Sequence, residues 1–192
     1  MEQAFTWQGL RLEWLTVAWC IIEAAVPIWS GIASRSIALI GFGLDSVIEI
    51  FAALVVIWQL QGLSEEKKKR ALQMIAVTFF LLAAYVFAQS VRELVMGVEA
   101  EVSLPGIIVT AAALIIMPLL AWAKRRVGHQ LGNPVLLAEA AESTLCALFA
   151  ATTLVGLILN AAVGWWWADP VAAIVIGILA VKEGREAWHA AI

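Results

Sequence analysis

Charged residues are scarce in this chain. Asp, Glu, Lys and Arg make up 14% of its 192 residues, whereas 63% are hydrophobic and the mean hydropathy is +0.92. Soluble domains carry about 25% charged and about 45–50% apolar residues. The imbalance excludes an ordinary soluble domain and predicts an integral membrane protein. Because its apolar runs have the length of membrane-spanning helices, we expect an all-α fold.

Cysteine and N-terminal basic residues are also few. Cys20 and Cys146 both lie in apolar runs, which indicates no disulfide framework. The first residues, Met-Glu-Gln, lack a basic stretch, so we expect no cleaved signal peptide and a first transmembrane helix that directs insertion. A net charge of -3 gives no reason to expect a nucleic-acid partner. We expect no enzyme, because no activated His, Ser or Lys nucleophile accompanies the membrane carboxylates.

Six apolar runs are long enough to cross a membrane, which takes about 20 residues for each helix. Charged or turn-forming clusters separate them, and the expected spans lie near residues 13–33, 37–61, 71–96, 105–123, 134–162 and 169–188. Residues 1–12 mix aromatic and charged side chains, which favours a short helix at the membrane interface. We therefore expect an interfacial segment at residues 1–12 and a six-helix transmembrane domain at residues 13–192.

The basic residues predict the orientation of the helices. Six crossings leave both termini on one side, together with the charged stretches 65–70 and 124–126. That side would hold ten of the twelve Lys and Arg residues, leaving Arg35 and Arg92 opposite, so the positive-inside rule makes it cytoplasmic. Tryptophans at both expected boundaries agree: Trp29 and Trp165 to Trp167 outside, and Trp14, Trp58, Trp122 and Trp188 inside. We expect both termini in the cytoplasm, in a bacterial inner (plasma) membrane.

Acidic residues lie near the middle of two of these runs, where a carboxylate costs about 2.5–3.5 kcal/mol. Asp45 and Glu49 are four residues apart in the second span, and Glu142 and Cys146 are four apart in the fifth. Such a step is about 6 Å along a helix and stays on one face. Because the two spans run in opposite directions, Asp45 is level with Cys146 and Glu49 with Glu142. Three carboxylates and a thiolate suit a tetrahedral site for a divalent metal ion.

Other interpretations of these acidic and sulfur residues stay open. Buried acids also form structural pairs with Lys or Arg, and Arg35 and Arg92 are the basic candidates away from the cytoplasmic ends. Cys146 also suits ordinary helix packing. Glu139 suits three roles, as a ligand on the way into the site, a partner of a ligand, or a group at the cytoplasmic vestibule. Glu23 suits the cavity wall or a hydrogen bond between helices.

Three stretches of the chain resemble the cation diffusion facilitator family. Residues 36–49, SIALIGFGLDSVIE, are similar to its second-helix motif, in which small residues lead to an acid, a Ser, and a second acid four positions after the first. Residues 137–146, LAEAAESTLC, resemble its fifth-helix pattern, in which a His or Asp and a later Asp complete the transport site. Residues 164–170, GWWWADP, and 182–186, KEGRE, resemble the start and end of its sixth helix.

The resemblance implies a bundle that exports a divalent cation from the cytoplasm by proton antiport. It implies a metal site of Asp45, Glu49, Glu142 and Cys146. Zn²⁺ is the first expected cargo, with cadmium, iron, cobalt and manganese as alternatives, and no organic cofactor is expected. The expected partners are the metal ion, protons, the lipid bilayer and a second copy in a homodimer.

The chain also departs from the family pattern. Glu142 stands where zinc transporters of the family have His or Asp, and Cys146 stands where they have Asp, so the identity of the metal does not carry over. Typical members continue after the sixth helix into a cytoplasmic domain that helps them dimerise, whereas we expect none here. The loop at residues 65–70 has no His to collect metal. A cation channel without proton exchange, and a membrane scaffold or partner subunit without transport, stay as alternative functions.

Overall fold

A computed structural model describes residues 2–34, 37–62, 64–96, 103–163, 165 and 167–192. The described residues form helices joined by short turns, with no strand among them, so the expected all-α fold is confirmed. The helices are α1 (Glu2–Ser34), α2 (Ile37–Leu60), α3 (Glu65–Met96), α4 (Leu104–Leu131), α5 (Pro134–Val163) and α6 (Ala168–Ala190).

Five of these helices are long and apolar enough to cross a membrane. Their candidate spans are Gln3–Ala33, Leu39–Leu60, Glu65–Met96, Leu104–Leu131 and Pro134–Val155. The sixth expected span coincides with α6, which is not in this group because its second half carries Lys182, Glu183, Arg185 and Glu186. Helix α6 lies in the same bundle and packs against α3 and α5.

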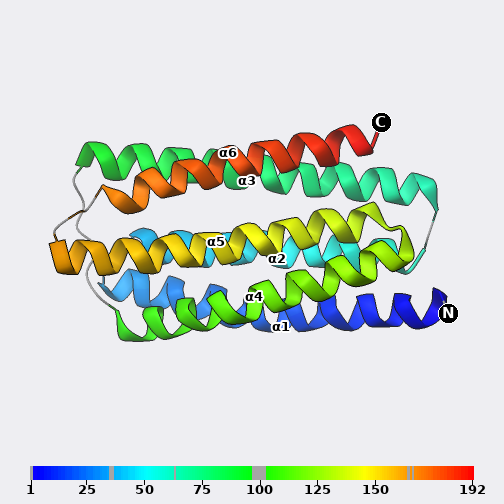
Figure 1. The fold of residues 1–192 in the computed structure, drawn as a ribbon, viewed down its shortest axis with the longest axis horizontal. Coiled ribbons are helices and arrows are strands. Elements are labelled where there is room, and N and C mark those ends of the chain that lie inside the picture. Colours follow the sequence, from blue (N-terminus) through cyan, green and yellow to red (C-terminus); the bar gives the residue numbers. More distant parts are fainter. Residues whose placement is uncertain (1, 35–36, 63, 97–102, 164, 166) are drawn as a thin grey trace.

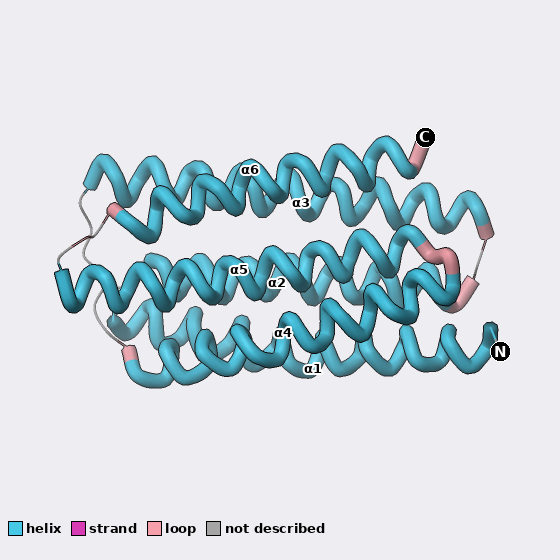
Figure 2. Tube along the Cα trace, viewed as in Figure 1, coloured by secondary structure: helices cyan, strands magenta, loops and turns pink. Residues whose placement is uncertain are grey.

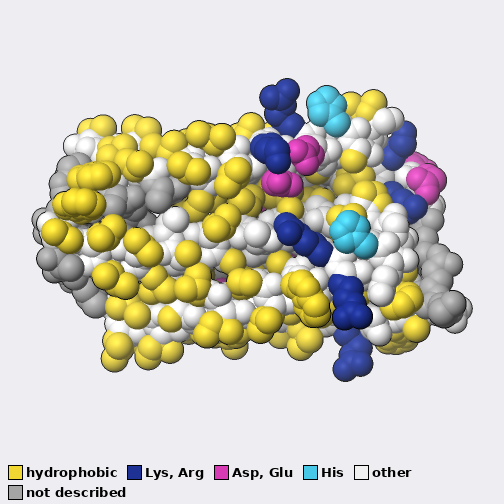
Figure 3. Space-filling view, in the orientation of Figure 1, with side chains coloured by type: hydrophobic (Ala, Val, Ile, Leu, Met, Phe, Trp, Pro, Cys, Tyr) yellow, Lys and Arg dark blue, Asp and Glu magenta, His cyan; other side chains and the backbone are white. Residues whose placement is uncertain are grey.

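The six helices form a bundle of roughly parallel and antiparallel rods (Figures 1 and 2). Helix α2 packs against α1, α3 and α5, and α4 packs against α1 and α5. The pair α3 and α6 flanks this group. Both termini lie at the same end, together with the α2–α3 and α4–α5 connections (Figure 1). Lys, Arg and His side chains gather toward that end on the face shown in Figure 3, whereas the other half of the face is hydrophobic where the structure describes it.

Three helix boundaries differ from the sequence-based expectation. Helix α3 begins at Glu65, so residues 65–70 are its first turns and not a loop. Residues 2–12 are the first turns of α1 and not a separate helix, because α1 runs without a break from Glu2 to Ser34. Helix α4 continues to Leu131, so residues 124–126 are helical and not a loop. Gly132, with φ of 57°, ends α4, and the Asn133 side-chain oxygen accepts the N–H groups of Val135 and Leu136 at the start of α5.

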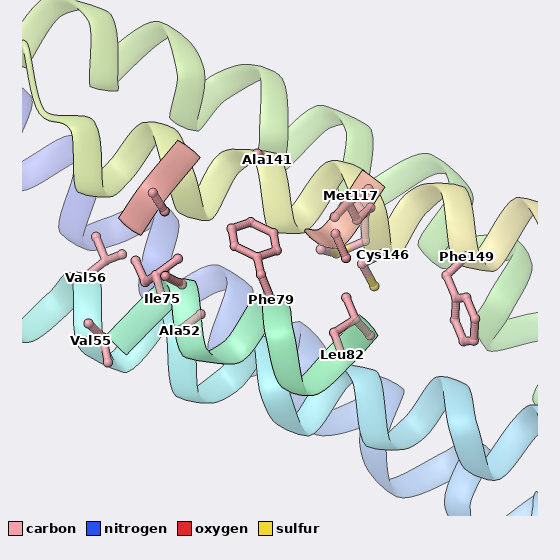
Figure 4. Close-up of a cluster of buried hydrophobic side chains, with 14 of the residues drawn as sticks. Ala52, Val55, Val56, Ile75, Phe79, Leu82, Met117, Ala141, Cys146 and Phe149 are labelled. Carbon is pink, nitrogen blue, oxygen red and sulfur yellow. The ribbon is translucent and has the colours of Figure 1, made fainter. Parts of the chain in front are cut away.

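The core joins α2, α3 and α5. Figure 4 shows Phe79 and Leu82 of α3 beside Ala52 of α2 and Cys146 and Phe149 of α5, in one cluster of buried hydrophobic side chains. The close approach of α1 and α2 depends on Gly43, because a Cβ there would lie 3.0 Å from the carbonyl oxygen of Ala24. Small residues of this kind allow helices in membranes to pack backbone to backbone.

The predicted orientation is testable with single cysteines in a Cys20→Ala, Cys146→Ala background. Substitutions Arg70→Cys and Arg125→Cys lie near the end that carries the termini, and Val95→Cys and Val163→Cys lie near the opposite end. We expect an impermeant maleimide added to intact cells to label positions 95 and 163 and to spare 70 and 125, because the positive-inside rule predicts that the basic end faces the cytoplasm. Labelling of position 70 without permeabilisation would reverse the topology.

Candidate metal centre

The four predicted ligands all lie in the interior of the bundle. Asp45 and Glu49 of α2 and Glu142 and Cys146 of α5 are each at most 3% exposed. The Cys146 thiol interacts electrostatically with the carboxyl groups of Asp45 and Glu49. Cys146 of α5 therefore lies near both acids of α2, although the ligand atoms of these three residues are not all within 4.8 Å of one another.

Glu142 has a hydrogen-bond partner on α3. The Thr78 hydroxyl of α3 donates a 3.3 Å hydrogen bond to Glu142 Oε2 and a 2.6 Å bond to the Ile75 carbonyl oxygen. The charge of Glu142 still interacts with those of Glu49 and Asp45. Its carboxyl group is thus held toward α3 while remaining within electrostatic range of the acids on α2.

A different trio is the more compact group. In the described part of the chain, the only set of three His, Cys, Asp or Glu side chains whose ligand atoms all lie within 4.8 Å of one another is Cys20, Glu23 and Glu49. Cys20 and Glu23 come from α1, and both are fully buried. No three of the four predicted ligands form such a set.

A buried lysine lies next to this region. Lys124 of α4 is fully buried, and its Nζ donates hydrogen bonds of 2.5 Å to Glu139 Oε1 and 3.0 Å to Ser143 Oγ. It also lies 3.6 Å from Glu13 Oε2 of α1. Ser143 Oγ in turn donates a 2.7 Å hydrogen bond to Glu49 Oε1. A continuous polar chain therefore joins Lys124 to the acid that the two groups of candidate ligands share.

This lysine corrects the expectation that Arg35 and Arg92 are the only basic partners for buried acids. Structural ion pairing does occur, but it involves Glu139 and Glu13. Arg35 lies outside the described residues. No ion pair in the described structure involves Asp45, Glu49 or Glu142, nor Glu23 of α1. Pairing with a basic residue thus accounts for Glu139 and leaves the acids of the predicted metal site without a counter-ion.

The interior holds an excess of acidic groups. Among residues whose burial is described, six buried carboxyl groups face a single buried ammonium group, that of Lys124. Each of these acids has at least one oxygen without a hydrogen-bond partner; they are Glu13, Glu23, Asp45, Glu49, Glu139 and Glu142. Buried carboxylates without donors are costly, and neighbouring like charges add to that cost. The arrangement therefore favours occupation of the interior by protons or by a cation.

Sequence reasoning missed Cys20, Glu13 and Lys124 as members of this network. The signal for the first two was present: positions 13, 16, 20 and 23 follow spacings of three, four and three, which place them on one helix face. All four side chains on that face are fully buried. Lys124 was hidden in a run of three basic residues, of which Arg125 and Arg126 are exposed.

Comparisons with known proteins were consistent with a transport fold. A family model described as the cation efflux transmembrane domain matches residues 73–190, which include Glu142 and Cys146. Magnetosome protein MamB from Magnetospira sp. (strain QH-2) is 25% identical over 167 residues, covering 81% of this chain. The aligned region amounts to 57% of that relative, so the chain spans little more than half of its length.

Proposed function

The chain belongs to the cation efflux, or cation diffusion facilitator, family, and on that premise we propose that it carries a divalent cation across a membrane in exchange for protons. The observation that supports this most directly is the buried acidic group on α2 and α5. Asp45, Glu49 and Glu142 each keep a carboxylate oxygen without a hydrogen-bond partner, and no Lys or Arg among the described residues pairs with them. Cys146 adds a sulfur atom beside two of these acids.

Zinc is the cargo that best suits this donor set. Zn²⁺ accepts a mixture of carboxylate oxygen and thiolate sulfur in four-coordinate sites. Sulfur also favours cadmium, whereas the three carboxylates suit harder ions such as manganese and iron. The proposed metal ligands are Asp45, Glu49, Glu142 and Cys146, and Thr78 keeps one oxygen of Glu142 oriented toward α3.

Proton exchange follows from the same chemistry. A thiol must lose its proton to bind metal, and protonated carboxyl groups must do the same, so metal binding releases protons. If the site opens alternately to the two sides of the membrane, a proton gradient directed inward would drive the metal outward. We propose that the end carrying both termini faces the cytoplasm of a bacterial cell, and that a second copy of the chain pairs with it in the membrane.

The decisive test measures metal and proton movement together. In proteoliposomes that enclose a zinc dye and a pH dye, we expect external zinc to enter while protons leave, because the metal displaces protons from the site. An opposing pH gradient at fixed voltage should reverse the direction of net zinc flux. The control is Glu93→Gln, which neutralises an acid of α3 that accepts a hydrogen bond from Gln89 and should transport normally.

The alternative functions give different results in the same assay. Zinc flux that ignores the pH gradient at fixed voltage would indicate a channel. A folded protein that moves neither zinc, cadmium nor manganese would indicate a scaffold or partner subunit, and either result would overturn the proposal of antiport.

A further inference from the structure

A second group of metal-ligand side chains lies beside the proposed transport site. Cys20 and Glu23 of α1 and Glu49 of α2 place one possible ligand atom each within 4.8 Å of the others. All three side chains are at most 1% exposed. Only Glu49 belongs to the four residues already proposed as transport ligands, so α1 contributes two ligands of its own.

The carboxylate oxygens in this group are incompletely bonded. The Cys20 thiol donates a 3.5 Å hydrogen bond to Glu23 Oε2, and Glu23 Oε1 has no partner. The Ser143 hydroxyl donates a hydrogen bond to Glu49 Oε1, and Glu49 Oε2 has no hydrogen-bond partner. A buried oxygen without a donor has lost its hydrogen bonds to water and has no protein hydrogen bond in their place, which destabilises the folded state. Two such oxygens beside a thiol therefore indicate a place for a cation.

The backbone of α1 supports the same placement. Pro27 lies inside the helix and has no N–H, so it cannot donate the usual hydrogen bond to the carbonyl oxygen of Glu23. The close approach at Gly43 holds α2 against Ala24, the residue next to Glu23. A side chain at position 43 would push α1 and α2 apart and separate Glu23 from Glu49.

We propose that Cys20, Glu23 and Glu49 form a second metal position for a soft divalent cation, next to the transport site and sharing Glu49 with it. One sulfur and two oxygen ligands leave a fourth place for water, the open coordination that is typical of zinc sites where ligands exchange. Binding breaks the S–H bond of Cys20, forms a sulfur–metal bond and releases that proton to water. The shared carboxyl group lets a cation pass between α1 and α5 without leaving the protein.

This inference rests on the proposed transport site for Glu49 but makes a separate prediction about Cys20. We expect purified protein in detergent to bind two cadmium ions per chain, measured by equilibrium dialysis with cadmium chloride. In Cys146→Ala, where Cys20 is the sole thiol, cadmium should still produce thiolate-to-metal charge-transfer absorption, at about half the parent intensity for one sulfur ligand of two. The absorption should vanish in the Cys20→Ala, Cys146→Ala double variant.

Matched variants separate the two positions. Cys20→Ser and Glu23→Gln should each bind one cadmium ion and keep the absorption from Cys146. Asp45→Asn should also bind one ion but keep the absorption from Cys20, so loss of the transport site alone is recognisable. The control Glu13→Gln neutralises a buried acid of the same helix whose partner is Lys124, and it should still bind two ions.

Two outcomes would overturn the proposal. One is a single cadmium ion per chain in the parent protein with no charge-transfer absorption in Cys146→Ala, which would make Cys20 a packing residue. The other is a single ion whose absorption falls in both Cys20→Ser and Cys146→Ala, which would mean one mixed site that uses both thiols. Transport measurements are not needed for either conclusion.

Discussion

Asp45→Asn is expected to reduce zinc transport in proteoliposomes to the level of protein-free liposomes, without unfolding the protein. The amide cannot supply the negative charge that a divalent ion needs, and it cannot release a proton when the ion binds. Glu49→Gln and Glu142→Gln should behave in the same way. Zinc uptake and the accompanying proton movement are measured together, with Glu93→Gln as the matched neutralisation on α3.

The stability of these variants provides an independent check. In detergent without metal, replacing a crowded buried carboxyl group relieves repulsion and desolvation. The thermal midpoint of Asp45→Asn should therefore equal or exceed that of the parent, instead of showing the roughly 0.5–3 kcal/mol loss usual for a point substitution. Zinc should raise the midpoint of the parent far more than that of the variant. A variant with the full zinc effect would place the transport site elsewhere.

Lys124→Met is expected to destabilise the protein by about 3–5 kcal/mol, because it leaves Glu139 and Glu13 buried without their shared positive charge. The free energy of unfolding is measured in detergent at neutral pH. The control is Arg125→Met on the adjacent, exposed position, which should change stability by less than about 0.5 kcal/mol.

A second substitution and a pH series test the cause of that loss. Lys124→Met combined with Glu139→Gln should recover most of the lost stability, because one of the uncompensated carboxylates is gone. The loss in Lys124→Met should also shrink as the pH falls, since acids that bind protons no longer require a counter-ion. A loss that is independent of pH and of Glu139→Gln would mean that Lys124 acts through packing alone.

The sequence predicted the helical bundle because each apolar run is long and is separated from the next by charge or turn residues. It also predicted that the termini share one end with the α2–α3 and α4–α5 connections, which follows from an even number of antiparallel helices, although it placed these connections at residues 65–70 and 124–126. Helix ends were less predictable. A run of basic residues resembles a loop, but a helix turns about 100° per residue and can bury Lys124 while exposing Arg125.

The candidate site was predictable only in part. Asp45, Glu49 and Cys146 could be placed together from spacing and helix direction. Residues four apart on two antiparallel helices lie at matching depths in the membrane. The contributions of Cys20 and Glu23 depend on how closely α1 approaches α2, which Gly43 decides and which no spacing within α1 reveals. The direction of Glu142 depends likewise on Thr78, a residue of another helix.

The Ser143 hydroxyl group has a single hydrogen, so it can donate only one hydrogen bond at a time. Ser143 accepts a hydrogen bond from the Lys124 ammonium group and donates one to Glu49 Oε1. Because the hydroxyl oxygen has two lone pairs, Ser143 can accept from Lys124 whether its own hydrogen points toward Glu49 or away from it. One side chain thus links the ion pair between α4 and α5 to the acid on α2.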